Sequence, residues 1–205
     1  MPNIEAVIFD WGGVLIADPA GGLMDYCARH MSVSVEDFTR AHNACVEPFQ
    51  KGLISEEAFW QDVCGVLDRP CPQLDSLWGQ AFRAIYSPRQ EVFALAQRVR
   101  ECDGKTALLT NTEQPVMQFW HEQGYDMFDA LVFSCAEGVF KPEREIYAIA
   151  ARRLGIAVER CAFIDDRQDF IDGAIAAGMR GIQYESFEQV ERELENLGVF
   201  SYVGR

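Results

Sequence analysis

Six polar residues with catalytic potential lie at or just beyond the ends of short apolar runs in the sequence. They are Asp10, Thr110, Asn111, Lys141, Asp165 and Asp166. Each also suits an ordinary role, because aspartate caps helices and threonine or asparagine forms turns. Parallel strands, however, end at a common edge of their sheet, and ligands of doubly wound folds bind there. We therefore interpret the six residues as one site.

Three of these residues, Asp10, Asp165 and Asp166, are carboxylates, and the set contains a single lysine. Like charges at short range raise one another's pKa values, so such a group is costly unless a cation joins it. Magnesium prefers one or two carboxylates with water and substrate phosphate, whereas zinc and copper favour cysteine or histidine. The pattern predicts a Mg²⁺ site and an anionic, phosphorylated small-molecule substrate.

The elements that would position this site alternate between strands and helices from residue 88 onward. Helical spacing predicts helices at 87–102, 113–124, 141–155, 168–178 and 186–198, and short apolar runs predict strands at 105–111, 130–135, 161–166 and 180–184. Alternation of this kind is typical of an α/β fold with a doubly wound parallel sheet.

A long helical segment separates the first predicted strand, residues 4–10, from the second. Its apolar residues recur three or four apart over 21–31, 34–49, 55–67 and 73–86. A crossover of almost ninety residues is too long for a connection, so it predicts a subdomain. We expect an α/β core domain formed by 1–17 and 87–205 and an inserted all-helical subdomain at 18–86.

Composition narrows the classes of partner. The 205 residues are 49% hydrophobic and carry a formal net charge of −14, which disfavours nucleic acid and anionic membranes as partners. The seven cysteines form no CxxC pair, and no apolar run approaches the roughly 18 residues of a membrane-spanning helix. We expect reduced thiols and a cytoplasmic location; the oligomeric state is left open.

Four segments in order, "VIFDWGGVL", "ALLTN", "FKP" and "FIDDRQDFIDGAIAAGM", resemble the signature motifs of the haloacid dehalogenase (HAD) superfamily. The resemblance covers the whole predicted core and implies a Rossmann-like, HAD-type sheet. The helical insertion matches in position the cap that many members carry after the first motif. The branch that it resembles most is that of capped sugar-1-phosphate phosphatases.

The resemblance also implies roles for individual residues. Asp10 would be the nucleophile that forms an aspartyl-phosphate, Thr110 would bind a phosphoryl oxygen, and Lys141 would neutralise phosphate charge. Trp11, Gly12 and Asn111 complete the expected substrate-binding set.

For the metal, the same resemblance aligns Asp166 with the usual direct ligand and Asp165 with the acidic residue before it. Asp165 would therefore act directly or through water. Asp10 would supply a carboxylate oxygen, and Gly12 only its backbone carbonyl.

Gly12 stands where phosphatases of this superfamily usually carry a second aspartate, the general acid. General acid–base catalysis contributes about 10² to 10⁴ in rate, so its absence favours substrates whose leaving group departs easily. Sugar-1-phosphates, acyl phosphates and aryl phosphates meet this condition. A mutase, which needs the missing acid, is disfavoured.

Two other functions stay open on these residues. A 2-haloacid dehalogenase also lacks the second aspartate, although it gains nothing from the Asp165–Asp166 pair. A non-catalytic binding or regulatory protein is also conceivable, but it has no reason to retain such costly charges. His30, His42 and His121 have no partnered nucleophile nearby in the sequence and are assigned to packing or surface positions.

Overall fold

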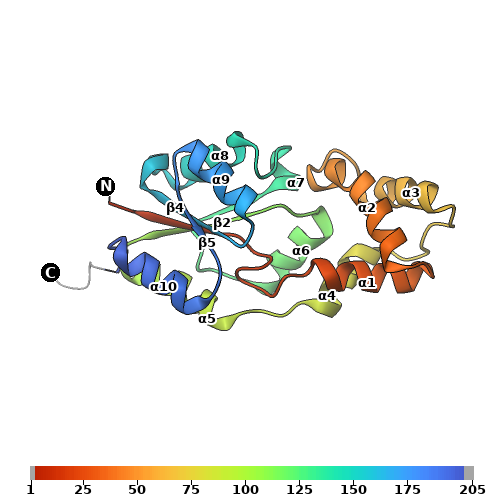
Figure 1. Ribbon diagram of the computed structural model, residues 1–205, viewed down its shortest axis with the longest axis horizontal. Helices are drawn as coiled ribbons and strands as arrows, with labels where there is room; N and C mark the ends of the chain where they lie inside the picture. Colours follow the sequence, from red (N-terminus) through yellow and green to blue (C-terminus); the bar gives the residue numbers. More distant parts are fainter. Residues whose placement is uncertain (1–2, 201–205) are drawn as a thin grey trace.

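A computed structural model describes residues 3–200 and contains a five-stranded parallel sheet (Figure 1). The order is β3-β2-β1-β4-β5, so the first strand lies at the centre. The strands are β1 (Ala6–Phe9), β2 (Lys105–Thr110), β3 (Ala130–Phe133), β4 (Cys161–Asp165) and β5 (Arg180–Gln183). This sheet confirms the predicted α/β, doubly wound, HAD-type fold class.

Every residue of β1 is buried, because helices cover both faces of the sheet. Side chains alternate across a strand, so Val7 and Phe9 face one hydrophobic cluster while Ala6 and Ile8 face the other. Phe9 pairs with Leu108 of β2 and with Ile164 of β4. The residues that follow these three strands therefore meet at one edge.

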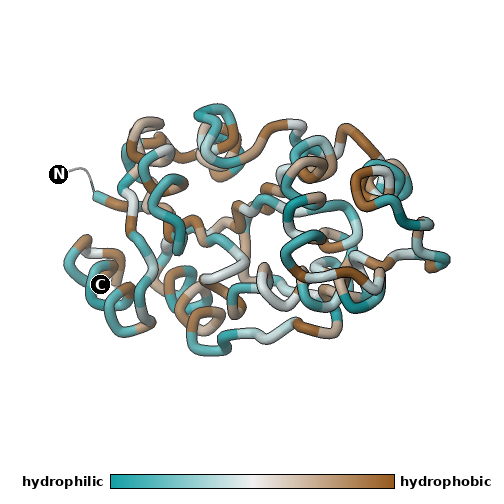
Figure 2. Tube along the Cα trace, turned by 45° about the vertical axis from the view of Figure 1, so that its right-hand side comes forward, coloured by the Kyte–Doolittle hydropathy of each residue, from teal (hydrophilic) through white to brown (hydrophobic). Residues whose placement is uncertain are grey.

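The helices form two layers (Figure 1). On one face, α8 (Arg144–Leu154) and α9 (Gln168–Ala177) pack on the sheet. The other face is covered by α5 (Gln90–Glu101), α6 (Gln114–Gln123) and α10 (Phe187–Asn196). Hydrophobic residues run along the interior strands and hydrophilic ones along the outer sides of the helices (Figure 2).

Four helices between β1 and β2 form the helical insertion and gather beyond one end of the sheet, at the right of Figure 1. They are α1 (Ala20–Met31), α2 (Val35–Gln50), α3 (Glu56–Leu67) and α4 (Leu77–Ile85). Serine side chains cap the last three by accepting a backbone N–H, at Ser34, Ser55 and Ser76. Their apolar faces join the hydrophobic cluster that contains α5 and α6.

Among the predicted elements whose bounds differ from the structure, two lie in the helical insertion or contact it. The strand predicted at 130–135 ends at Phe133, and Ser134 begins a short helix, α7 (Ser134–Glu137). The Ser134 hydroxyl donates to the carbonyl of Gln50, 2.7 Å away, so this residue contacts the helical insertion instead of extending the sheet. The helix predicted at 73–86 begins only at Leu77, because Ser76 caps it.

Within residues 3–200, no helix has the length and apolarity that crossing a membrane requires.

The turn after α2 approaches the backbone of the sheet domain closely. Gly52 has a φ of +66°, and a Cβ placed there would lie 2.0 Å from the carbonyl oxygen of Cys135. Neighbouring Lys51 forms ion pairs with Glu47 and with Glu143, both at 2.9 Å, the second across the junction. Only glycine satisfies both the backbone angle and the contact.

Replacing Gly52 by alanine should therefore destabilise the protein by at least about 2 kcal/mol, because it adds left-handed strain and a backbone clash. Urea unfolding measures the change. The matched control is Gly65→Ala on α3, where an added Cβ meets open space. That variant should keep or raise stability, by up to about 1 kcal/mol. Equal stability of the two variants would contradict the close contact.

Candidate active site

The site begins at the carboxyl end of the central strand. Asp10 follows β1 directly, and its N–H donates to the carbonyl of Ile164 on β4, 2.9 Å away. Thr110 ends β2 on one side and Asp165 ends β4 on the other. All three side chains are buried, with at most 6% of each residue exposed. The strand order thus brings together residues that are 55 to 155 positions apart.

Lys141 enters this group from the loop before α8 and is only 1% exposed. Its ammonium lies 2.8 Å from Oδ1 of Asp10 and 2.6 Å from Oδ2 of Asp165. The rings of Phe163 and Phe170 flank it at 5.3 and 4.8 Å. A buried ammonium is costly unless it is paired, so the two carboxylates fix its position.

Burial raises the pKa of the Asp10 carboxyl to about 7; the charge of Asp165 adds to the rise, and Lys141 opposes it. Burial followed by Asp165 also raises the pKa of Asp166, which is half-buried. A single lysine therefore does not neutralise this group of carboxylates.

The three carboxylates could hold a metal ion. One ligand oxygen from each of Asp10, Asp165 and Asp166 lies within 4.8 Å of the others. Both carboxylate oxygens of Asp165 already accept hydrogen bonds. Oδ2 accepts one from Lys141, and Oδ1 accepts one from the N–H of Arg167, 2.9 Å away. Oδ1 of Asp10 is also buried, and it forms an ion pair with the Lys141 ammonium at 2.8 Å. A hard cation suits these oxygen ligands.

The two glycines after Asp10, Gly12 and Gly13, differ in how much room each leaves for a side chain. Gly13 has a φ of +79°, and a Cβ there would lie 2.3 Å from Cγ of Asp166, so the carboxylate occupies the space that a side chain would need. A Cβ on Gly12 would meet only Pro19, at 3.1 Å. Arg89 fixes this loop by donating to the carbonyls of Gly13, Val14 and Ile16.

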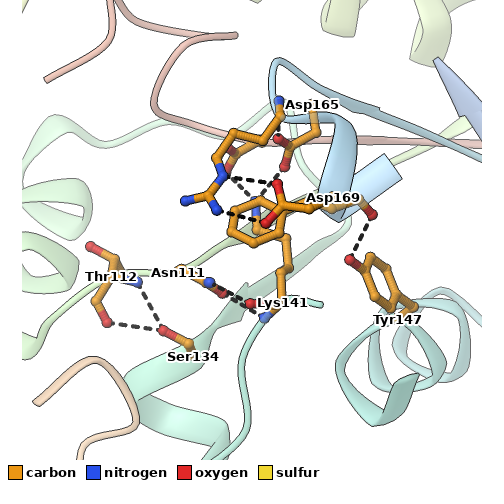
Figure 3. Close-up of polar contacts among 10 residues, drawn as sticks. Asn111, Thr112, Ser134, Lys141, Tyr147, Asp165 and Asp169 are labelled. Carbon is orange, nitrogen blue, oxygen red and sulfur yellow. Dashed lines mark hydrogen bonds and ion pairs between the residues drawn. The ribbon is translucent and has the colours of Figure 1, made fainter. Parts of the chain in front are cut away.

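Asn111 positions Lys141 through two hydrogen bonds to its backbone (Figure 3). The amide nitrogen of Asn111 donates to the Lys141 carbonyl at 2.9 Å, and its oxygen accepts from the Lys141 N–H at 2.8 Å. Nearby, the Thr112 N–H donates to the hydroxyl of Ser134 at 2.8 Å. These bonds connect the loop after β2 to the loop that carries the lysine.

A cavity of about 200 Å³ opens onto these groups. It is lined on the sheet side by Asp10, Gly12, Thr110, Asn111 and Lys141 and on the side of the insertion by Leu23, Met24, His42, Gln50 and Trp78. Trp11, expected to bind substrate, is not among the lining residues. Its indole packs against aromatic rings of α4 and α6, including Phe82 and Trp120.

Sequence reasoning missed the apolar lining of this cavity and, among its polar residues, His42, Gln50, Thr112, Glu113 and Arg167. His42 and Gln50 lie eight positions apart on α2, a helical spacing that places them on similar faces. Glu113 lies two residues after the end of the second motif and is buried, which is unusual for a glutamate without an ion-pair partner. Nothing in the linear sequence shows that α2 reaches the sheet edge.

Gly13→Ala should weaken Mg²⁺ affinity about 10-fold or more, because the new methyl group displaces the carboxylate of Asp166. Isothermal titration calorimetry measures the affinity. Gly21→Ala on α1 is the control, since a Cβ there meets nothing within 4 Å. Unchanged affinity in the Gly13 variant would show that Asp166 does not bind the ion.

Comparisons with known proteins agree with this geometry. The family model described as "haloacid dehalogenase-like hydrolase" matches residues 4–178. Phosphatase MT3486 of Mycobacterium tuberculosis is 35% identical over 212 residues, covering 96% of each chain. Sesquiterpene phosphatase astK of Aspergillus oryzae is 25% identical and covers 88% of this chain and 89% of its own.

Solved structures agree in fold. A HAD family enzyme of Bacteroides thetaiotaomicron, crystallised as a magnesium complex, is similar with a TM-score of 0.79 at 20% identity, covering 93% of this chain and 100% of its own. L-2-haloacid dehalogenase of Xanthobacter autotrophicus gives a TM-score of 0.66 at 21% identity, with 94% and 83% covered. The chain belongs to the haloacid dehalogenase-like hydrolases.

Proposed function

We propose that this hydrolase is a Mg²⁺-dependent phosphatase that acts on a small phosphorylated metabolite through an aspartyl-phosphate. The observation that carries the proposal is the arrangement at the strand ends: Asp10 lies beside a buried lysine and two further carboxylates, in a cavity. Phosphoryl transfer depends mainly on positioning and on neutralisation of charge. The 35% identical relative named a phosphatase supports the same reaction class.

Asp10 and Asp166 are the side chains proposed to hold Mg²⁺, together with the backbone carbonyl of Gly12. Asp165 is proposed to act on the ion through water and not as a direct ligand, because both of its oxygens already accept hydrogen bonds. The ion, when bound, neutralises charge on the phosphate oxygens. It also offsets the burial and the like charge that raise the pKa of Asp10.

In the proposed reaction, a carboxylate oxygen of Asp10 attacks phosphorus and forms an O–P bond as the bond to the leaving oxygen breaks. The leaving oxygen takes up a proton from solvent. Water then attacks the aspartyl-phosphate, which releases inorganic phosphate and restores the carboxylate. Lys141 holds Asp10 in position and neutralises phosphate charge, while Thr110 offers its hydroxyl to a phosphoryl oxygen.

The helical insertion, residues 18–86, is proposed to act as a cap that encloses the leaving group. Its residues Leu23, Met24 and Trp78 line the cavity. Gly12 supplies no proton, which favours a leaving group that departs without strong acid catalysis. An anomeric oxygen leaves more readily than a simple alkoxide, so a sugar-1-phosphate is the proposed type of substrate.

The dehalogenase alternative gains no specific support from the site. The similarity to the Xanthobacter dehalogenase, at 21% identity, is a similarity of fold and does not by itself indicate the reaction. Asp10, Asp165 and Asp166 are three carboxylates close to a single lysine, so their negative charge is in excess. This excess favours the binding of a cation with an anionic substrate over an attack on carbon that needs no metal.

Asp10→Asn should lower phosphate release by at least about 10³-fold while the fold is kept, because the amide is a poor nucleophile. Release from acetyl phosphate and circular dichroism measure the two properties. Asp62→Asn, at an exposed position of α3, is the control. Retained turnover in the Asp10 variant would end the nucleophile assignment.

Glucose-1-phosphate should be hydrolysed with a kcat/KM about 10²-fold above that of glucose-6-phosphate, and release should stop when a chelator removes Mg²⁺. Colorimetric phosphate assays with and without chelator measure both effects. Equal rates for the two sugars would mean that another residue donates the proton. Chloride release from 2-chloropropionate, with no phosphate release from any ester, would favour the dehalogenase.

A further inference from the structure

The wall of the cavity formed by the helical insertion carries polar groups that the proposed phosphoryl transfer does not use. Gln50 of α2 and Trp78 of α4 meet Glu113, which comes from the loop between β2 and α6. His42, also from α2, lies beside Trp78 on the same wall. A bound phosphate ester would have its leaving group on this side, because Asp10 and Lys141 occupy the other.

Glu113 is a buried carboxylate whose hydrogen bonds come from neutral groups. The residue is 5% exposed. The indole N–H of Trp78 donates to Oε2 at 2.8 Å, and the amide of Gln50 donates to Oε1 at 3.0 Å. Burial raises the pKa of the Glu113 carboxyl. Among the described residues, the charged side chain that acts on it is Glu56, which is also negative and raises this pKa further. No cation in residues 3–200 offsets this charge.

The two neutral donors leave acceptor capacity on Glu113. An ionised carboxylate has about four lone-pair sites, and Trp78 and Gln50 use one on each oxygen. Because both oxygens accept N–H donors, the contacts favour the ionised form. The geometry therefore suits a group that receives further hydrogen bonds, and it does not suit a proton donor for the leaving oxygen.

His42 adds a second acceptor to the same wall. Its Nδ1 lies 3.0 Å from Oδ1 of Asn43, which can only accept, so the proton of the neutral ring is on Nδ1. Nε2 then carries a lone pair, and it is buried without a hydrogen-bond partner among residues 3–200. The ring stacks on Trp78 with centroids 5.2 Å apart and an interplanar angle of 12°.

We propose that Glu113, with His42, determines specificity by selecting an uncharged, hydroxylated leaving group and rejecting an anionic one. The proposal rests on the proposed phosphatase function and narrows its substrate. Hydroxyl groups can donate to the remaining lone pairs of Glu113 and to Nε2 of His42, which has no partner among residues 3–200, whereas a carboxylate or a second phosphate would meet a buried like charge. The volume of about 200 Å³ is below the ~300–1,000 Å³ of pockets for drug-sized ligands and suits a single sugar ring.

A matched pair of substrates tests this proposal: glucose-1-phosphate and glucuronic acid-1-phosphate. In both, the bond to the same anomeric oxygen is cleaved, and they differ only at C6, which is a hydroxymethyl group in glucose and a carboxylate in glucuronic acid. The wild-type enzyme should prefer the neutral sugar by about tenfold or more in kcat/KM. In Glu113→Gln, this preference should fall by about tenfold or more, because the repelling charge is gone.

Two further variants separate specificity from structure. Glu113→Asp keeps the charge and should restore much of the preference, whereas Glu101→Gln, which removes an exposed carboxylate of α5, is the matched control. His42→Phe keeps the stacking on Trp78, removes the acceptor and should lower kcat/KM for glucose-1-phosphate. If the role of Glu113 were only structural, its replacement would lower kcat/KM for both substrates in proportion and leave the ratio of the two values unchanged.

The outcomes distinguish this proposal from the one on which it rests. An unchanged ratio in Glu113→Gln, with phosphate still released from acetyl phosphate, would overturn the specificity role and leave the phosphatase in place. No release from any phosphate by the wild type would overturn the proposed function itself. If Glu113→Gln fails to fold, the wild-type ratio decides, and equal use of the two sugars overturns the proposal.

Discussion

The buried ammonium of Lys141 is the constraint on which the site depends. It lies between Asp10 and Asp165, at 2.8 and 2.6 Å, with almost no exposure to water. Removing either carboxylate would leave a buried charge without its full pairing, which is costly. The two hydrogen bonds from Asn111 to the lysine backbone hold this ion pair network against the loop after β2. The position of Asp10, the proposed nucleophile, thus depends on four segments of the chain.

Those segments meet because of the sheet order. β1 lies between β2 and β4, so Asp10, Thr110 and Asp165 end on neighbouring strands. Asp166 adds a carboxylate that Lys141 does not reach, and Gly13 has no side chain where that carboxylate lies. The resulting excess of negative charge is unfavourable alone and suits a cation together with an anionic substrate. Such a local arrangement would let the proposed phosphate substrate bind although the net charge of the protein opposes it.

The helical insertion contributes the second half of the cavity. Gly52 allows its chain to approach Cys135 closely, and Ser134 holds the carbonyl of Gln50. These contacts bring α2 to the sheet edge, where the Gln50 side chain meets Glu113. The same junction that joins the insertion to the core therefore also builds the cavity wall that carries Gln50 and Glu113. Under the proposed function, stability and substrate choice would be coupled at this point of the structure.

The sequence by itself determined the fold class and the set of reacting groups, because local hydrophobic periodicity and four short motifs carry both. Asp10, Thr110, Lys141 and the Asp165–Asp166 pair were all predicted, and the structure brings them together. Tertiary structure alone decided which residues of the helical insertion line the cavity. Glu113 and His42 are held at the cavity by contacts with Trp78, which is 35 and 36 positions away along the chain. Trp11, predicted to bind substrate, is instead packed among aromatic rings. Periodicity reports which face of a helix is apolar, but not which other helix that face will meet.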